Sequence, residues 1–243
     1  MPEAYQCKAL LRNLLARVGL RAYRRADTLQ RLLQRFDVEV VLDVGANAGQ
    51  FARQLRARGY RGRIVSFEPL AGPYAKLKFN TALIPNWQAV QLALGDEDET
   101  RTIHVAGNSQ SSSFLEMLPQ HLAAAPKSAY VGTETVTVRR LDRVIDQYCG
   151  PGERLFLKID TQGFEAAVLR GARETLTRCS GVQLEMSIAP LYQGELLLPE
   201  LIAEMAKQGF VLMDLKPGFF DPRSGELLQL DGLFFRRPVL SSP

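Results

Sequence analysis

The feature that most constrains the fold is a regular alternation of short apolar strands and amphipathic helices between residues 38 and 95. The predicted strands are 38–44, 63–69 and 87–95, and the predicted helices are 48–59 and 73–83. Each strand is a short β-branched or aromatic run, and the first helix ends at Gly59. A β-α-β-α-β order indicates a parallel sheet whose crossovers are right-handed. We therefore expect an α/β protein with helices on both faces of the sheet.

The middle of the chain departs from this alternation. Residues 101–106 and 133–141 each alternate as strands, and the serine-, alanine- and proline-rich segment 107–128 lies between them. We interpret this region as a small inserted β/loop elaboration or lid. Asp142 is expected to cap a short helix that follows it.

The parallel pattern then resumes towards the C-terminus. The predicted strands are 154–160, 181–187, 209–215 and 231–237, and the predicted helices are 164–176 and 195–208. A proline- and glycine-rich loop joins the last two strands, which favours an antiparallel ending. The sequence thus predicts a Rossmann-like fold with a mostly parallel seven-stranded sheet and an antiparallel last strand. One domain is expected over residues 36–243, since no linker divides them.

Basic charge is concentrated at the N-terminus. Residues 1–35 carry eight basic and two acidic side chains, whereas the whole chain has a net charge of +4, so the remainder is slightly acidic. General nucleic-acid binding is therefore not implied. Segment 1–35 also has helical apolar spacing, and it predicts a basic amphipathic helical segment. Such a segment either packs on the domain edge or contacts a membrane or a synthase.

The cysteine and histidine content indicates the cellular compartment and limits the kinds of metal site that are expected. The three cysteines, Cys7, Cys149 and Cys179, are far apart, which argues against a disulfide framework and fits a cytoplasmic protein. There are only two histidines, so a multi-histidine metal site is not expected. Apolar runs are too short for a membrane span. Peripheral contact with the inner membrane face remains an alternative because of the basic segment.

The turn after the first strand predicts the cofactor class. In VLDVGANAGQF (41–51), Asp43 ends the strand, and Gly45 and Gly49 open the turn. A dinucleotide fingerprint needs glycines at relative positions 0, 2 and 5, but Asn47 and Gln50 stand at the second and third of these. The turn therefore suits a cofactor without phosphates, such as S-adenosylmethionine (SAM). We expect the Asp43 carboxylate to lie near the SAM ammonium.

Further cofactor contacts are expected at the next two strand ends. Glu68 ends the second strand, at the sheet edge where ligands bind, and a carboxylate there can accept hydrogen bonds from ribose hydroxyls. Leu94 and Asp96 lie in the acidic loop after the third strand and are expected near the adenine. Ser112, in the serine run 111–113, is expected to donate a hydrogen bond to SAM or to the acceptor.

Asp160 is the first candidate for the base that removes a proton from the acceptor, because it ends the strand predicted beside the cofactor strand. The alternative is a helix cap. Lys158 lies on the same strand face and is expected to pair with Asp160 or Glu185. Glu185 is a candidate wall of the acceptor pocket. No metal site is predicted, although Asp160 with Glu185 or Asp96 leaves Mg²⁺ open.

These motifs resemble a known family. LKIDTQGFEAAVLRGA (157–172), in series with DVGANAG, SFEPL, LALGD, RRLD and QLEMS, is similar to the FkbM family of methyltransferases over roughly residues 38–236. The resemblance implies a class I methyltransferase fold, SAM as cofactor, and O-methylation of hydroxyls on sugars, glycolipids, polyketides or similar natural products. Many members carry an acidic residue where this chain has Gln162, so Gln162 is given no catalytic role. The alternatives are a nicotinamide-dependent oxidoreductase and a non-catalytic SAM-fold docking module.

Overall fold

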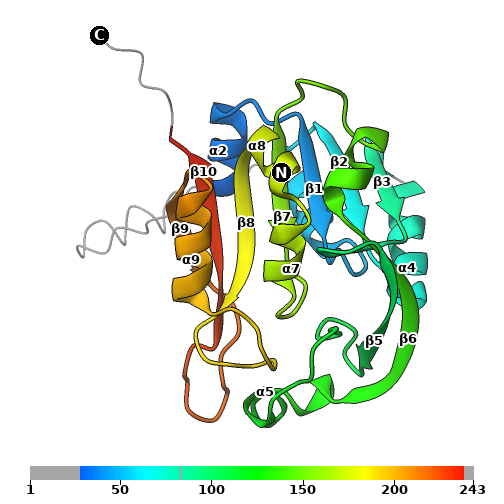
Figure 1. Ribbon diagram of the computed structural model, residues 1–243, viewed down its shortest axis with the longest axis vertical. Helices are drawn as coiled ribbons and strands as arrows, with labels where there is room; N and C mark the ends of the chain where they lie inside the picture. The colour runs from blue at the N-terminus through cyan, green and yellow to red at the C-terminus, as the bar shows by residue number, and fades with distance from the viewer. Residues whose placement is uncertain (1–27, 83, 238–243) are drawn as a thin grey trace, which may run out of the picture.

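The computed structural model describes residues 28–82 and 84–237. The greater part of the predicted N-terminal segment, residues 1–27, therefore lies outside the described residues. A seven-stranded sheet crosses the molecule in the order β3-β2-β1-β7-β8-β10-β9 (Figure 1). Its strands are β1 (Val40–Val44), β2 (Arg63–Phe67), β3 (Trp87–Val90), β7 (Leu155–Ile159), β8 (Cys179–Ser187), β9 (Phe210–Pro217) and β10 (Gln229–Arg236).

Strand pairing confirms the predicted fold class. Strands β3, β2, β1, β7 and β8 run parallel to one another. Strand β10 lies between β8 and β9 and is antiparallel to both. The antiparallel ending therefore comes from the last strand inserting between two earlier ones. The carboxyl ends of β1, β7 and β8 consequently share one edge, where ligands bind in parallel sheets.

Helices cover both faces of the sheet because successive strand residues point in opposite directions. In β1, Val40 and Leu42 pack into one core, and Val41 packs into the other. The first core contains the inner faces of α6 (Leu141–Val144), α7 (Glu165–Arg170), α8 (Arg173–Arg178) and α9 (Leu198–Lys207). The second contains those of α2 (Thr28–Arg35), α3 (Gln50–Ala57) and α4 (Ala71–Ala82).

The predicted insertion is a second, three-stranded sheet with order β4-β6-β5. It consists of β4 (Ala93–Leu94), β5 (Glu99–Ala106) and β6 (Tyr130–Arg139). The prediction of one strand over 87–95 was therefore wrong, because the chain leaves the central sheet after Val90 and β4 pairs with β6. Between β5 and β6 come α5 (Pro119–Ala124) and a 3-10 turn, Pro126–Ser128. Figure 1 places α5 beyond the carboxyl ends of the central strands.

The predicted helix 164–176 is divided into α7 and α8 at Gly171 and Ala172. Gly171 lies so close to Gly95 that a Cβ would overlap the Gly95 carbonyl. The expectation that Asp142 caps its own helix was also wrong. Asp142 lies inside α6, and its carboxylate accepts hydrogen bonds from the backbone N–H of Thr175 (2.8 Å) and of Glu174 (3.2 Å), at the start of α8.

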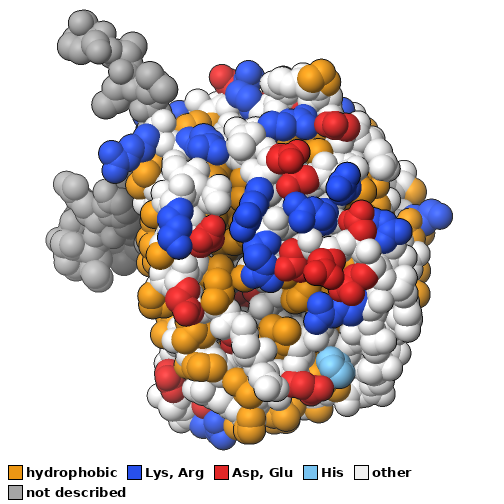
Figure 2. All heavy atoms as spheres, in the orientation of Figure 1, with side chains coloured by type: hydrophobic (Ala, Val, Ile, Leu, Met, Phe, Trp, Pro, Cys, Tyr) orange, Lys and Arg blue, Asp and Glu red, His pale blue; other side chains and the backbone are white. Residues whose placement is uncertain are grey.

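The surface over α7, α8 and α9 mixes charges of both signs. Figure 2 shows Lys and Arg side chains interspersed with Asp and Glu side chains on this face. Such mixing produces no extended field of one sign over the coloured residues in view. In the part of the chain that the structure describes, no helix has the length and apolarity needed to cross a bilayer.

Candidate active site

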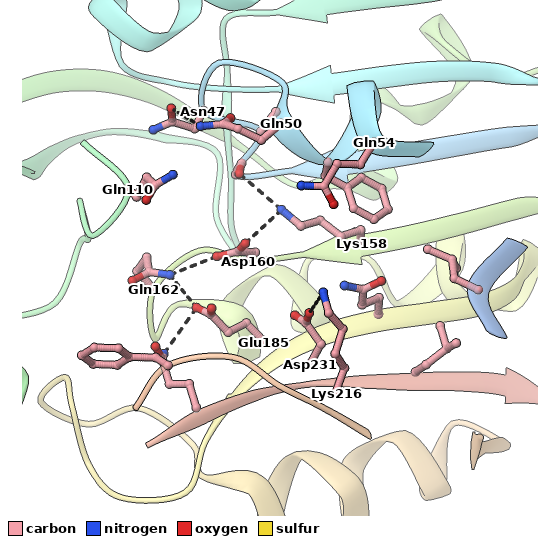
Figure 3. Close-up of a pocket in the computed structure, with 18 of the residues that line it drawn as sticks. Asn47, Gln50, Gln54, Gln110, Lys158, Asp160, Gln162, Glu185, Lys216 and Asp231 are labelled. Carbon is pink, nitrogen blue, oxygen red and sulfur yellow. Dashed lines mark hydrogen bonds and ion pairs between the residues drawn. The ribbon is translucent and has the colours of Figure 1, made fainter. Parts of the chain in front are cut away.

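Two adjoining cavities open at the carboxyl ends of the central strands. The larger has a volume of about 730 Å³ and the smaller about 60 Å³. They adjoin because Gly45, Asn47, Gln110, Asp160 and Gln162 line both of them. Figure 3 shows the side chains of Asn47, Gln110, Asp160 and Gln162 converging from the loop after β1, the inserted region and the loop after β7. The shared wall is therefore the place where two bound molecules would meet.

The turn after β1 needs the predicted glycines because there is no room for a side chain at these positions. Gly45 has φ 73°, and a Cβ there would overlap the backbone carbonyl of Asp160. Gly49 has φ 84° and begins α3 against the ring of Trp87. Asn47, between them, also has a positive φ of 47°. Only glycine tolerates both the left-handed backbone and the lack of space at the first two positions.

Glu68 and Asn47 organise the smaller cavity. The Glu68 carboxylate accepts hydrogen bonds from the backbone N–H of Asn47 (2.8 Å) and of Leu70 (3.0 Å). Burial raises the pKa of Glu68 to about 7. Leu94 and Ser112 line the same cavity. At about 60 Å³ the cavity holds only part of a nucleoside, and the Glu68 carboxylate on its wall is a group to which ribose hydroxyls can donate.

Lys158 joins two carboxylates under the shared wall. Its ammonium lies 3.3 Å from Oδ1 of Asp43 and 3.2 Å from Oδ2 of Asp160. Burial lowers the pKa of Lys158, but the charges of Asp160 and Asp43 outweigh this and raise it. Burial raises the pKa of Asp43, and Lys158 and Ser66 oppose that shift. Lys158 thus stays charged and holds the Asp160 carboxylate in place.

Two expectations about this group need correction. Asp43 is fully buried and is not among the residues that line the two cavities, so its carboxylate contacts Lys158 and Ser66 instead of a ligand ammonium. Lys158 pairs with Asp160, as expected, but its second partner is Asp43 and not Glu185. The register explains this: Lys158 faces Asp43 across β7 and β1, whereas β8 places Gln183 opposite Lys158.

Gln162 connects the two candidate carboxylates, a role that the sequence did not reveal. Its side-chain amide donates hydrogen bonds to Asp160 (3.0 Å) and to Glu185 (2.5 Å), as Figure 3 shows. Its side-chain carbonyl accepts a hydrogen bond from the Tyr192 hydroxyl (2.8 Å). Its backbone has φ 57°. Burial and the charge of Asp160 raise the pKa of Glu185. In the sequence, the feature that could have indicated this bridging role is the position of Gln162 immediately before Gly163, in the loop after β7.

The helix-cap alternative for Asp160 finds no support. No side chain caps the start of α7, whose N-cap residue is Phe164. The Asp160 side chain is one-third exposed and faces the larger cavity. The adjacent acid, Glu165, accepts hydrogen bonds from the backbone and hydroxyl of Thr161, and burial raises its pKa to about 7. Glu165 therefore orders the loop that carries Asp160.

Asp96 and the two histidines, His104 and His121, divide between cavity-wall positions and structural ones. Asp96 binds Arg170 through two contacts of 2.8 Å and does not line the cavities, which corrects its expected place at the adenine. His121 lines the larger cavity, and burial lowers its pKa to about 4. His104 stacks on Tyr130, away from both cavities. Among the described residues, no group of three or more potential ligand side chains is placed to hold a metal ion.

Comparison with known proteins agrees with this geometry. The model of a family described as the methyltransferase FkbM domain matches residues 43–212. The 2-O-methyltransferase NoeI of Sinorhizobium fredii is 28% identical over 191 residues, which cover 72% of this chain and 78% of that protein. The AMB antimetabolite synthetase AmbE of Pseudomonas aeruginosa is 37% identical over 79 residues, but these are 32% of this chain and only 4% of that much longer protein.

Two solved structures that follow a similar course of the chain are described as methyltransferases. A 1,6-didemethyltoxoflavin-N1-methyltransferase of Burkholderia thailandensis, solved with S-adenosylhomocysteine, is 11% identical, with a TM-score of 0.46 and coverage of 96% of this chain and 89% of that one. A TehB-like SAM-dependent methyltransferase of Corynebacterium glutamicum is 12% identical, with a TM-score of 0.40 and coverage of 98% and 100%. The family match spans well over half of the chain, and so this protein belongs to the FkbM family of methyltransferases and uses S-adenosylmethionine as its cofactor.

Proposed function

We propose that the protein transfers the SAM methyl group to a hydroxyl oxygen of a sugar, glycolipid, polyketide or similar natural product. The observation that carries this proposal is the pair Asp160 and Glu185, bridged by Gln162 at the edge of the larger cavity. An alcohol loses its proton only to a positioned base, and two carboxylates next to the cofactor turn supply one. The likeness to the 2-O-methyltransferase NoeI supports oxygen as the accepting atom.

The chain's own residues would hold the cofactor across the shared wall. Gly45, Asn47 and Gly49 bring the backbone of the turn close to the ligand, and Glu68 is placed to accept from the ribose hydroxyls. Leu94 and Ser112 contribute to the wall of the base pocket. The cofactor supplies an electrophilic methyl group. The protein's part is then to hold an acceptor oxygen in line with that methyl at attack distance.

Asp160 is the residue that we assign to proton removal. As the oxygen–carbon bond forms and the sulfur–carbon bond breaks, the hydroxyl proton passes to the Asp160 carboxylate. Lys158 holds Oδ2 of this carboxylate, and Gln162 donates to Oδ1. Glu185 shares the Gln162 amide and is placed either to receive the proton or to bind a second hydroxyl. Which carboxylate is protonated at the end of the step is a property of the bridged pair.

The test replaces Asp160 with Asn in the full chain. Turnover with a hydroxylated acceptor should fall by about 10²–10⁴-fold, the usual contribution of a general base. SAM affinity, measured by calorimetry, should change less than about threefold, a difference well under 1 kcal/mol. Asp146→Asn is the matched control, since the Asp146 side chain is 89% exposed in a surface ion pair. Unchanged turnover in Asp160→Asn would refute the assignment.

Two other functions are separated by the same measurements. A nicotinamide-dependent oxidoreductase would bind NAD⁺ and not SAM, although Asn47 and Gln50 break the glycine pattern that a pyrophosphate requires. A non-catalytic SAM-fold module would bind SAM, yet methylate nothing in an acceptor screen. Methyl transfer to a nitrogen or a carbon would leave the family intact and contradict only the O-methyl assignment.

A further inference from the structure

One face of the sheet carries polar side chains across four strands beyond the reacting centre. Lys158 on β7 faces Gln183 on β8, and Glu185 on β8 faces Asp231 on β10. Asp231 in turn faces Lys216 on the edge strand β9. All five side chains line the larger cavity, and Figure 3 shows Asp231 and Lys216 beyond Glu185, on the side away from Gln162.

The opposite face of these strands is apolar. Leu184 and Leu230 point into the core under α7, α8 and α9. Sheets that helices cover on both faces are ordinarily apolar on both. The part of this face that lies farther from the cavity follows that rule, because Phe156 near the start of β7 and Phe235 near the end of the antiparallel β10 belong to the same apolar core as Leu33 of α2. The polar side chains on these strands therefore begin at the point that α2 no longer covers, where the larger cavity opens.

The composition of this surface selects the chemistry of its ligand. The five side chains are two carboxylates, one amide and two ammonium groups, and Lys216 lies 3.6 Å from Asp231 with its side chain 67% exposed. An apolar acceptor would cover these groups without replacing their hydrogen bonds, which is costly. An anionic acceptor would meet Glu185 and Asp231. Neutral hydroxyl groups, which both donate and accept, satisfy every member of the set.

The length of the surface exceeds what one reacting unit needs. Three strand spacings of ~4.8 Å separate β7 from β9, which gives about 14 Å from Asp160 to Lys216 across the sheet. We propose that Gln183, Asp231 and Lys216 form a second subsite that binds the neighbouring sugar units of a neutral oligosaccharide acceptor. This inference rests on the proposed O-methyl transfer, and it adds the size and charge class of the substrate.

The test measures binding of full-length protein, saturated with S-adenosylhomocysteine, to an array of neutral and acidic glycans from one to six units. We expect the retained glycans to be neutral and to contain at least two units. Lys216→Ala combined with Gln183→Ala should weaken their binding at least tenfold, with SAM affinity and melting temperature unchanged. Lys207→Ala is the matched control, because Lys207 lies in a surface pair on α9, behind the apolar face.

The outcomes separate this inference from the proposed function. The second subsite would be overturned if monosaccharides bound as well as longer glycans, if acidic glycans were preferred, or if no glycan were retained. Binding by the double variant at the wild-type level would overturn it as well. Radiolabelled SAM then tests whether the retained glycans, or the single sugars, become O-methylated. O-methylation of oligosaccharides that the double variant leaves unaffected would refute the subsite and keep the proposed function. Retained glycans without O-methylation would refute the proposed function and keep the subsite.

Discussion

At the scale of the residue, Gln162 decides how the two carboxylates share charge. A neutral amide can donate to Asp160 and Glu185 at once, and the Tyr192 hydroxyl orients it by donating to its oxygen. This arrangement lowers the repulsion between two acids that both face the larger cavity. Gln162 is therefore a positioning residue, which acts on the reaction through the acids it bridges.

Replacing Gln162 with Glu should move the pH dependence of catalysis. A third carboxylate favours protonation of the pair, because like charges raise one another's pKa. The rising limb of kcat/KM should shift towards higher pH by about one unit or more. Gln162→Ala is the comparison, since it removes the bridge without adding charge. A loss of activity that is equal at every pH in Gln162→Glu would mean that Gln162 has only a structural role.

Lys158 illustrates the cost of a buried charge without its partner. The residue is 5% exposed, and its ammonium pairs with both Asp43 and Asp160. Lys158→Met should lower the free energy of unfolding by about 3–5 kcal/mol, because it leaves Asp43 charged and buried. Adding Asp43→Asn should recover part of this loss in a denaturant-unfolding cycle. Lys207→Met, in an exposed pair, should cost less than about 1 kcal/mol. Strictly additive effects at Lys158 and Asp43 would contradict the coupling.

At the scale of the element, the turn between β1 and α3 joins the fold to the site. It passes under the loop after β7 so closely that Gly45 lies against the Asp160 carbonyl. The side chain of Asn47 extends from this turn to the inserted region, where it donates to the Ser109 carbonyl at 3.1 Å. One short turn thus fixes the distance between the cofactor wall, the candidate base and the lid-like insertion.

Gly45→Ala should therefore damage binding more than left-handed strain alone explains. The added methyl must displace the Asp160 backbone, and so SAM affinity should fall at least tenfold by calorimetry. Gly59→Ala is the matched control, because Gly59 also has a positive φ, 101°, but a Cβ there meets no atom within 4 Å. The control should lose only the ~1–2 kcal/mol of stability that a left-handed residue costs. Equal SAM affinity in the two variants would contradict the close-approach argument.

At the scale of the whole molecule, buried acids tie stability to pH. Burial raises the pKa of Glu165 and of Glu68 from 4.5 to about 7. Between these values the folded state keeps protons that the unfolded state releases. The contribution of these two groups to the free energy of unfolding should therefore fall as pH rises from 4.5 to about 7, and then level off. Each group contributes at most ~1.4 kcal/mol per pH unit within that window.

Glu165→Gln should flatten this dependence without removing it, because Glu68 still contributes. The measurement is denaturant unfolding at several pH values across the window. Glu204→Gln on the surface of α9 is the control and should keep the wild-type slope. A steeper slope in Glu165→Gln, or one unchanged from wild type, would show that Glu165 is ionised in the folded protein throughout.

The sequence by itself determined the features that depend on local pattern. Strand and helix alternation, the glycine turn at 45–49 and the acids at the ends of β2, β7 and β8 are read from neighbouring residues, and they predicted the sheet, its antiparallel ending and the cofactor class. Their boundaries shifted by a few residues, and the break after Val90 was missed because β4 forms only by pairing with β6, some 45 residues later in the chain.

Only the tertiary structure decided which polar groups meet. Lys158 pairs with Asp43 because β7 lies beside β1 in one register, although 115 residues separate them. Gln162 bridges Asp160 and Glu185 because β8 lies beside β7 and the loop after β7 turns back through a left-handed residue. Asp96 is drawn to Arg170 of α7 and away from the cavity. Periodicity gives the face on which a side chain lies, whereas strand order and register choose its partner.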